Sequence, residues 1–332
     1  MYPDTQTTSG ASPSVASVTV IGTGTMGSAI TRRLLTTGMT VNVWARDPRA
    51  AAALAELGAT VFDDPRDAVA VATVVLTLLP TADATSEVMI GRQVVDALAP
   101  QAVWVQMGTI GVEATEQLDI EVRARRPDVA FVDAPVSGSR GPAESGQLLV
   151  LASGPESAVG PVSPVFDAIG RRTMWLGPAG TGSRMKLVLN TWLAFEVEAA
   201  AESAALATSL GIAPGALADA VDGNAVASPL ALAKLTKMQT ADDRAEFALG
   251  WALKDLELMR ASVGSRPAPV ALAIADRWRV LVEQGVGDLD VSAARLGLGD
   301  DMPSTERGRP MIAPVNGLPA VPSKVEADRA GS

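Results

Sequence analysis

Short apolar runs alternate with amphipathic segments along the first half of the chain. The runs are rich in β-branched and aliphatic residues, which is typical of strands that are buried on both faces. They occupy residues 18–22, 40–45, 71–80, 102–108, 129–138, 147–154 and 172–177. Between two of them, the segment 48–58 has Pro near its start and Gly at its end and predicts a helix. The alternation predicts right-handed crossovers and an α/β fold with a doubly wound, mostly parallel sheet.

The pattern changes at residue 183, after which helical periodicity continues without a strand signal. Residues 183–210 contain neither Gly nor Pro, and Gly211 ends the run. At about 1.5 Å per residue, this segment predicts one helix roughly 40 Å long. Further helices are expected at 214–223, 229–239, 246–264 and 269–285. The second half is therefore predicted to be all-α, and the long helix is predicted to join it to the sheet.

These patterns divide the chain into parts. We expect a sheet domain at 17–180, a helical domain at 181–298, a disordered N-terminal segment at 1–16, and a Pro-rich tail at 299–332 that is disordered or loosely packed. The N-terminal segment lacks the basic and apolar regions of a signal peptide. The longest apolar run covers only 69–80, whereas a membrane helix needs about 20 residues. The sequence thus predicts a cytoplasmic protein with no membrane partner.

Composition narrows the chemistry that the chain can perform. The 332 residues include 27 Lys and Arg against 37 Asp and Glu, and this net charge of −10 argues against a nucleic-acid partner. The chain has no Cys, so disulfides, thiolate nucleophiles and Cys-based metal sites are excluded. It also has no His, which removes the commonest catalytic base and transition-metal ligand. We expect no metal, and Lys is the leading candidate for acid–base chemistry.

A glycine-rich turn follows the first predicted strand and opens a helix. Gly22, Gly24 and Gly27 form a G-x-G-x-x-G motif, which in this context is typical of dinucleotide binding. One Gly makes the tight turn, one lets the backbone approach a pyrophosphate, and one lets helix and strand pack closely. The cofactor-binding residues predicted here are Gly22, Thr23, Gly24, Thr25, Met26 and Gly27. The alternative is a glycine turn that binds no ligand.

The end of the second predicted strand bears on the choice of cofactor. An acid there would bind the ribose hydroxyls of NAD, but this chain has Ala45, Arg46 and Asp47. The planar guanidinium of Arg46 could hold a 2′-phosphate, which favours NADP over NAD. Asp47 works against that choice unless it points to solvent or holds Arg46. Alternatively, Arg46 is a surface residue that opens the next helix.

Lys186 and Asn190 lie four residues apart in the long predicted helix, so they share one face of it. Their neighbours are mostly apolar, and a Lys in such a stretch is costly unless it is paired or lies in a cleft. Burial also lowers the pKa of a Lys toward the range that is useful for proton transfer. The alternative is a Lys whose stem covers apolar surface and whose charge reaches water, with an Asn packed beside it.

A third motif, at residues 133–146, follows a predicted strand. Ser137, Gly138 and Ser139 come just after the strand, where open α/β sheets bind their ligands. Gly138 would free backbone N–H groups to face an anion such as a carboxylate. The motif alone favours an ordinary strand-to-helix turn.

Together and in this order, the motifs resemble those of the β-hydroxyacid dehydrogenase family, which includes 3-hydroxyisobutyrate dehydrogenase. The resemblance covers about residues 18–298 and rests on VIGTGTMGSAI, DAPVSGSRGPAESGQL, GPAGTGSRMKLVLN, LKDLEL and GVGDLDVSA. It is strongest toward the NADPH-linked glyoxylate/succinic semialdehyde reductase branch. It implies a Rossmann-type sheet domain followed by an all-α domain, assembled into homodimers or homotetramers through the α domain.

The resemblance also implies a role for each matching residue. Lys186 is the general acid or base, and Asn190 orients the substrate beside it. Ser137, Gly138 and Ser139 hold the substrate carboxylate. Further cofactor contacts are implied for Arg46, Leu79, Pro80, Thr109 and Lys254. The chain departs from the family pattern at Gln106-Met107-Gly108-Thr109, where D-x-S-[ST] is common, at Thr191, where a second Asn is frequent, and at Ala45.

The function implied is hydride transfer between NADPH and a short carbonyl acid, a semialdehyde or glyoxylate, to give a hydroxy acid. One alternative is an NAD-dependent 3-hydroxyisobutyrate dehydrogenase. Others are an imine reductase and a non-catalytic NADP-binding scaffold. Relatives of the last two kinds usually lack the Lys, so the presence of Lys186 argues against both.

Overall fold

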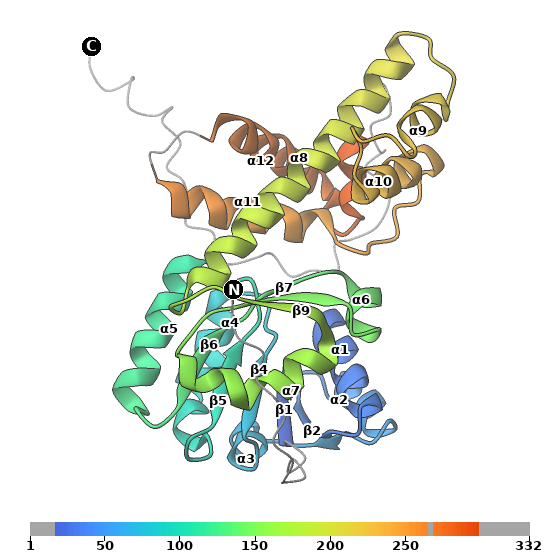
Figure 1. Cartoon of the computed structure of the whole chain (residues 1–332). Coiled ribbons are helices and arrows are strands. Elements are labelled where there is room, and N and C mark those ends of the chain that lie inside the picture. The colour runs from blue at the N-terminus through green and yellow to red at the C-terminus, as the bar shows by residue number, and fades with distance from the viewer. Residues whose placement is uncertain (1–16, 265–267, 299–332) are drawn as a thin grey trace, which may run out of the picture.

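The computed structural model describes residues 17–264 and 268–298, and a parallel six-stranded sheet forms its lower half (Figure 1). The spatial order of the strands is β3-β2-β1-β4-β5-β6. Their bounds are β1 Ser17–Ile21, β2 Thr40–Trp44, β3 Thr60–Val61, β4 Val74–Thr77, β5 Val103–Gln106 and β6 Ala130–Asp133. The predicted α/β fold with a Rossmann-type sheet is confirmed. The strand order reverses between β1 and β4, and such a switch point is where open sheets bind ligands.

Apolar residues occur on both faces of these strands because alternate residues enter two different cores. On β1, Val18 and Val20 pack into one core, and Ile21 packs into the other. Helices α1 (Thr25–Thr36), α2 (Pro48–Ala55), α6 (Arg140–Glu144) and α7 (Val159–Ile169) contribute to the first core. On the opposite face lie α3 (Pro65–Ala70), α4 (Ala82–Ser86), the π-helix η1 (Glu87–Gly91), the 3-10 helix η2 (Val95–Ala97) and α5 (Val112–Arg125). This double coverage explains why the strand signals lack polar alternation.

The last three predicted strand segments do not simply extend the main sheet. A second sheet forms from β7 (Val136–Ser137), β8 (Leu148–Ala152) and β9 (Gly170–Trp175). The predicted run 129–138 breaks after Asp133 because Pro135 has no N–H to donate to a ladder. Beyond Pro135 the chain continues as β7, which pairs antiparallel with β8, while β8 and β9 are parallel. The two-residue strand β3 was not anticipated.

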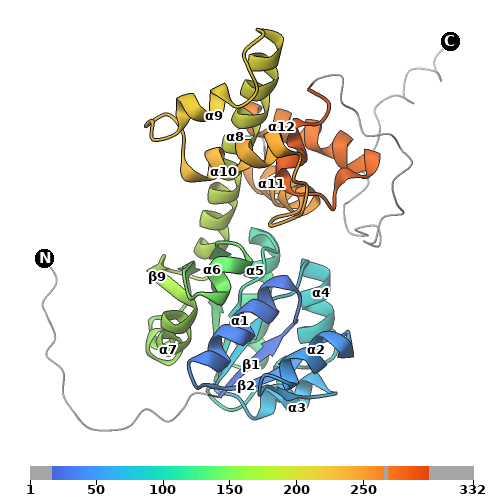
Figure 2. The ribbon, with the colours of Figure 1, turned by 90° about the vertical axis from the view of Figure 1, so that its right-hand side faces the viewer.

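The upper half of the molecule is helical, and the long helix α8 (Thr181–Ser209) rises into it from the sheet (Figures 1 and 2). The other elements are α9 (Ala216–Val221), α10 (Pro229–Thr240), α11 (Leu249–Val263), α12 (Pro269–Leu281), the π-helix η4 (Val282–Val286), and the 3-10 helix η5 (Val291–Arg295). They pack around α8 over a core that includes Trp278, which is fully buried. The prediction of an all-α second half joined by one long helix is confirmed.

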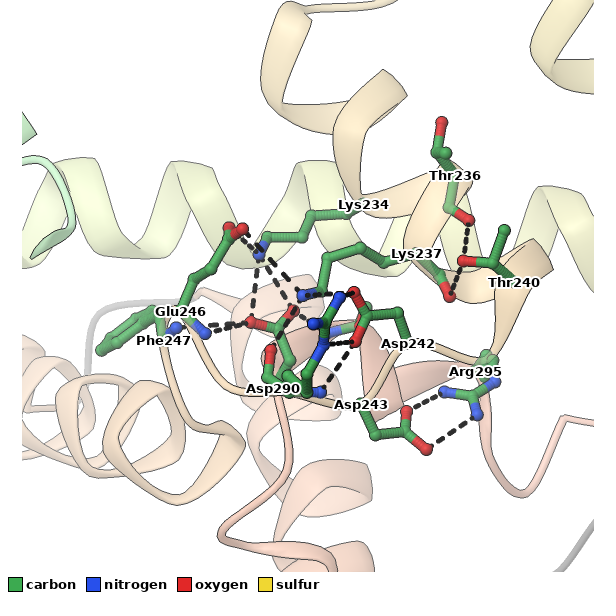
Figure 3. Close-up of polar contacts among 12 residues, drawn as sticks. Lys234, Thr236, Lys237, Thr240, Asp242, Asp243, Glu246, Phe247, Asp290 and Arg295 are labelled. Atoms are coloured by element: carbon green, nitrogen blue, oxygen red, sulfur yellow. Dashed lines mark hydrogen bonds and ion pairs between the residues drawn. The ribbon is translucent and has the colours of Figure 1, made fainter. Parts of the chain in front are cut away.

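A buried polar cluster fixes the segment that leads into α11 (Figure 3). Lys234 on α10 is 4% exposed, and its Nζ lies 2.9 Å from Asp290 Oδ1 and 3.1 Å from Glu246 Oε2. Asp290 also accepts hydrogen bonds from the backbone N–H groups of Glu246 and Phe247. The cluster thereby ties α10 and the loop before η5 to the start of α11.

Helix α8 has the length to span a bilayer but not the required apolar character. Among the residues described, no helix is both long and hydrophobic enough to cross a membrane. Nor do acidic side chains in the described part of the chain form a group of three or more that could hold a metal ion.

Candidate active site

The glycine-rich turn joins β1 to α1 at the switch point, and each of its glycines has a separate structural reason. Gly22 has a φ of +97°, and a Cβ there would lie 2.7 Å from the carbonyl oxygen of Leu78. A Cβ on Gly27 would lie only 1.9 Å from the carbonyl oxygen of Gly22. A Cβ on Gly24 would meet nothing within 4 Å. The first and third glycines therefore serve the packing of strand and helix, whereas Gly24 leaves room for a ligand.

The start of α1 fits an anion. Gly24 is its N-cap, no side chain caps its first N–H groups, and its first turn contains no acidic residue. A cavity of about 290 Å³ opens beside this end and is lined by Thr23, Gly24 and Thr25 among others. The Thr23 hydroxyl is buried there and has no hydrogen-bond partner in the described part of the chain. Free N–H groups at a helix start are suited to a dinucleotide pyrophosphate.

The residues that follow β4 and β5 pack closely around the glycine-rich turn. A Cβ on Gly22 would lie 3.0 Å from the Leu79 side chain, and one on Gly108 would lie 2.4 Å from the Leu79 carbonyl oxygen. Buried Gln106 accepts a hydrogen bond from Thr77 and donates one, 2.7 Å long, to the carbonyl oxygen of Gly108. The departure from the family pattern at Gln106 and Gly108 thus makes a compact turn. It leaves Leu79, Pro80 and Thr109 at the carboxyl edge of the sheet.

A second cavity, of about 230 Å³, lies at the end of β2. Arg46 and Arg92 both line it, and the Arg92 guanidinium stands 5.6 Å from the centre of the Trp44 ring. Asp47 turns to its own helix, where it accepts a 3.0 Å hydrogen bond from the Arg49 N–H and caps α2. This hydrogen bond also holds the pKa of Asp47 below its usual value. Asp47 is therefore engaged with Arg49 and not with Arg46.

The first turn of α8 is fixed to the sheet by one buried carboxylate. Asp133, at the end of β6, accepts 2.7 Å hydrogen bonds from both the backbone N–H and the hydroxyl of Ser183. It also accepts one from the Ser153 hydroxyl at the end of β8. Burial raises the pKa of Asp133, and these donors oppose that rise. Because Lys186 lies one helical turn beyond Ser183, this attachment sets the position of Lys186 above the sheet edge.

Lys186 and Asn190 point toward α11. The Asn190 side-chain amide donates a hydrogen bond to Asp255, which is 4% exposed. Lys254 also approaches Asp255, with its Nζ 2.9 Å from Oδ1, and donates to the carbonyl oxygen of Thr109. Four sequence-predicted residues, Thr109, Lys186, Asn190 and Lys254, thus gather around Asp255, which the sequence did not single out.

Within this cluster Lys186 is partly buried, and no described residue forms a hydrogen bond or ion pair with its ammonium group. Desolvation lowers the pKa of Lys186, the Asp255 carboxylate opposes that effect, and Lys254 adds to it. A Lys in such surroundings exchanges its proton more readily than one in water.

Ser137, Gly138 and Ser139 follow β6 and lead into α6 at the same edge of the sheet (Figure 1). A Cβ on Gly138 would lie 2.8 Å from the Leu148 side chain, so the turn is tightly packed as well as left-handed, with a φ of +132°. Strand β7, which includes Ser137, contacts α8. No hydrogen bond joins the three residues to Lys186 or Asn190 among the described contacts.

Comparison with known proteins gives the family. The description "NAD binding domain of 6-phosphogluconate dehydrogenase" matches residues 17–177, and "NAD-binding of NADP-dependent 3-hydroxyisobutyrate dehydrogenase" matches residues 180–296. Glyoxylate/succinic semialdehyde reductase 1 of Arabidopsis thaliana is 31% identical over 82% of this chain and 95% of its own length. The chain belongs to the β-hydroxyacid dehydrogenase family.

Two further proteins are similar to this chain over most of its length. The chloroplastic glyoxylate/succinic semialdehyde reductase 2 of Arabidopsis thaliana is 28% identical over 83% of this chain and 78% of its own length. The solved 3-hydroxyisobutyrate dehydrogenase of Mycobacterium tuberculosis aligns with a TM-score of 0.77 at 27% identity and covers 85% of this chain and 98% of that one. As a β-hydroxyacid dehydrogenase, the protein is an NAD(P)-dependent oxidoreductase that acts on CH–OH groups. The turn at Gly22–Gly27 provides room and donors for such a nicotinamide cofactor.

The sequence did not single out Asp133, Asp255 or Arg92, which the structure places next to residues of the predicted site. Asp133 and Asp255 lie inside motifs that carried the resemblance, so their position in those motifs was an available signal. Nothing in the sequence indicated that Asp255 would meet Asn190, 65 residues away. Arg92 carries no motif, and only the cavity beside Trp44 draws attention to it.

Proposed function

We propose that the protein uses NADPH to reduce a short carbonyl acid to a hydroxy acid, with Lys186 as the proton donor. The observation that carries this proposal is the position of Lys186, partly buried, without an ionic partner among the described residues, and beside Asn190 and Asp255. When bound, a reduced nicotinamide supplies the hydride. The carbonyl carbon gains that hydride, the carbonyl oxygen gains the Lys186 proton, and the product is a hydroxy acid. In the reverse direction, neutral Lys186 takes the hydroxyl proton.

Two further parts of the chain contribute to this chemistry. The positive charge of Lys186 stabilises the negative charge that develops on the carbonyl oxygen. Asn190 orients the substrate, and its own amide is held in place by Asp255. We assign the substrate carboxylate to the turn of Ser137, Gly138 and Ser139. The names of the Arabidopsis relatives, and the L-serine that accompanies the Mycobacterium tuberculosis enzyme in its structure, favour short acids with an oxygen function.

The preference for NADP rests on the second cavity. Arg46 and Arg92 offer two guanidinium groups to a 2′-phosphate, and Asp47 is already engaged with Arg49. We assign the further cofactor contacts to Leu79, Pro80, Thr109 and Lys254, which lie around the carboxyl edge of the sheet. An NAD-dependent 3-hydroxyisobutyrate dehydrogenase is the second candidate, and the Mycobacterium tuberculosis neighbour supports it.

We also propose that the protein forms a homodimer or homotetramer through its helical half. Val188, Trp192 and Phe195 follow one another along α8 at helical spacing, and each is at least 36% exposed. Such a stripe is suited to packing against a second copy of the chain. We further propose the domain boundaries at residues 180 and 298 and a location in the cytoplasm.

A substrate panel tests the proposed function. The purified protein is mixed with NADPH or NADH and with glyoxylate, succinic semialdehyde, methylmalonate semialdehyde or a cyclic imine, and the loss of reduced-cofactor absorbance is followed. We expect turnover of at least one aldehyde acid, with NADPH favoured over NADH and with Arg46→Ala reducing that preference. Turnover of the imine alone would identify an imine reductase. Binding of NADPH without any turnover would identify a scaffold.

A further inference from the structure

The cavity beside the start of α1 has a second wall that the glycine motif does not explain. Helix α6 packs against α1 near this end (Figures 1 and 2). Besides Thr23 and Gly24, the cavity is lined by Arg32 from α1 and by Arg140 and Glu144 from α6. Two cations and one carboxylate therefore face the uncapped N-terminus of a twelve-residue helix.

Thr23 provides an independent sign that this cavity takes an anion. Its side chain is only 6% exposed, and its hydroxyl finds no partner among the described residues. A buried hydroxyl without a partner is costly, and a ligand oxygen would remove that cost. Together with the free N–H groups of α1 and the two guanidinium groups, the hydroxyl matches the oxygens of a pyrophosphate.

Arg140 is free to change partners. Its side chain is 65% exposed, and its Nε lies 2.9 Å from Oε1 of Glu144, one turn along the same short helix. An exposed ion pair of this kind stabilises a protein little. A phosphate offers a guanidinium two charge-assisted hydrogen bonds at once. Exchange of Glu144 for a phosphate is therefore favourable for Arg140.

We propose that Arg140 holds the cofactor pyrophosphate from the side opposite the glycine turn and thereby couples cofactor binding to the substrate turn. The proposal rests on the proposed function, because it takes the dinucleotide as the ligand and Ser137–Ser139 as the carboxylate site. Arg140 directly follows Ser139 in the chain. When Arg140 engages a phosphate, the backbone of this turn loses freedom before the substrate arrives. Coupling of this kind is reciprocal, so a bound hydroxy acid also strengthens cofactor binding.

Titration of the reduced cofactors by their fluorescence tests the phosphate contact. We expect Arg140→Gln to raise the Kd of NADPH and of NADH by about tenfold alike, because both cofactors contain the pyrophosphate and a hydrogen bond to a charged group is lost. Glu144→Gln should lower both Kd values, since it frees Arg140. Arg123→Gln is the matched control, because the Arg123 side chain is as exposed as that of Arg140 and is also paired with an acid four residues away on its own helix, Asp119 on α5, away from the cavity. It should leave both Kd values unchanged.

The same titrations, repeated with saturating glycolate or 4-hydroxybutyrate, measure the coupling. In the wild type we expect at least one of the two hydroxy acids to lower the Kd of NADPH. The coupling factor is the ratio of the Kd of NADPH without the hydroxy acid to the Kd with it. In Arg140→Gln we expect this coupling factor to shrink toward one. Equal cofactor Kd values for Arg140→Gln and the wild type would overturn the contact between Arg140 and the pyrophosphate. A coupling factor that is the same in both proteins would overturn the coupling between cofactor and substrate binding. Both outcomes would leave the proposed reaction standing. A wild type that binds neither cofactor would overturn the proposed function and this inference together.

Discussion

Lys186 and Lys234 lie in neighbouring helices of the same half of the molecule, yet their surroundings are opposite. The ammonium of Lys234 meets Asp290 and Glu246 at 2.9 and 3.1 Å in a closed cluster (Figure 3). The ammonium of Lys186 lies near Asp255 and Lys254 of α11 and forms no ion pair with any residue that the structure describes. Asp255 lies near it but is occupied by Asn190 and Lys254.

Under the proposed function, this difference separates a structural lysine, Lys234, from the proposed proton donor, Lys186. Lys234 is paired with Asp290 and Glu246, so its removal would leave the Asp290 carboxylate buried without its cation. Lys186 is left with its proton available to a ligand, in surroundings that lower its pKa by desolvation. The reactivity of a lysine therefore depends on the acceptors that it lacks as much as on its own chemistry.

Lys186→Met should have the greatest effect of the substitutions considered. Because the proton donor is lost while the apolar stem is kept, turnover of the accepted aldehyde acid should fall by roughly 10²–10⁴. Cofactor Kd and the free energy of unfolding should stay close to the wild-type values. Steady-state rates, fluorescence titration and urea denaturation measure the three quantities. Turnover that remains at the wild-type level would remove Lys186 from the mechanism.

Lys234→Met should have the opposite effect to Lys186→Met: it should lower stability and leave turnover nearly unchanged. The substitution leaves Asp290 buried without its cation, so we expect the free energy of unfolding to fall by about 3–5 kcal/mol. Turnover per folded molecule should change little at a temperature where the variant remains folded. Lys234→Met combined with Asp290→Leu removes both charges, and it should recover part of the lost stability in urea denaturation. A stable Lys234→Met with low turnover would reverse the roles of the two lysines.

The pH dependence of turnover sharpens the account of Lys186. Reduction needs the ammonium form, so its rate should fall as the pH rises through the lowered pKa of Lys186, below the ordinary value of 10.5. Oxidation needs the neutral amine, so its rate should rise over the same interval. Asp255→Asn removes a carboxylate that raises this pKa and should move both changes to lower pH. Initial rates in both directions from about pH 6 to about pH 10 test this, and a break unaffected by Asp255→Asn would contradict it.

A smaller effect is expected at acid pH, on the stability that the cluster of Lys234 and Asp290 contributes. Burial by itself would raise the pKa of Asp290, but hydrogen bonds from Lys234 and from the backbone of Glu246 and Ser292 hold it below 3.8. A lowered folded-state pKa contributes stability above the unfolded-state value and loses it as the pH falls through the folded-state value. The stability difference between the wild type and Asp290→Asn should therefore be largest near neutral pH and shrink below about pH 4. Urea denaturation across this interval measures it, and a constant difference would argue against the assignment.

Local sequence patterns were enough to predict much of the fold and part of the candidate site. The motif Gly22–Gly27 is predictable because Gly22 and Gly27 avoid clashes with atoms within the turn or just beyond the adjoining strand, while Gly24 leaves open space beside the helix start. The helix over 183–210 was predictable because it lacks Gly and Pro, and the structure places α8 at Thr181–Ser209. The separate sheet of β7, β8 and β9 was not predictable, because periodicity does not encode which strands pair: β7 pairs with β8, and β8 pairs with β9.

Residue order alone was enough to predict most of the strands, the long helix and the glycine-rich turn, and it excluded Cys and His from any acid–base chemistry. It singled out Lys186 but did not indicate which groups would surround its ammonium or that of Lys234. Folding in three dimensions gave Lys234 its acceptors, one of them 56 residues away, and left Lys186 beside a carboxylate that others already occupy. The physical reason is that the charge state of a buried amine depends on the groups within a few ångströms, and those groups come from distant parts of the chain.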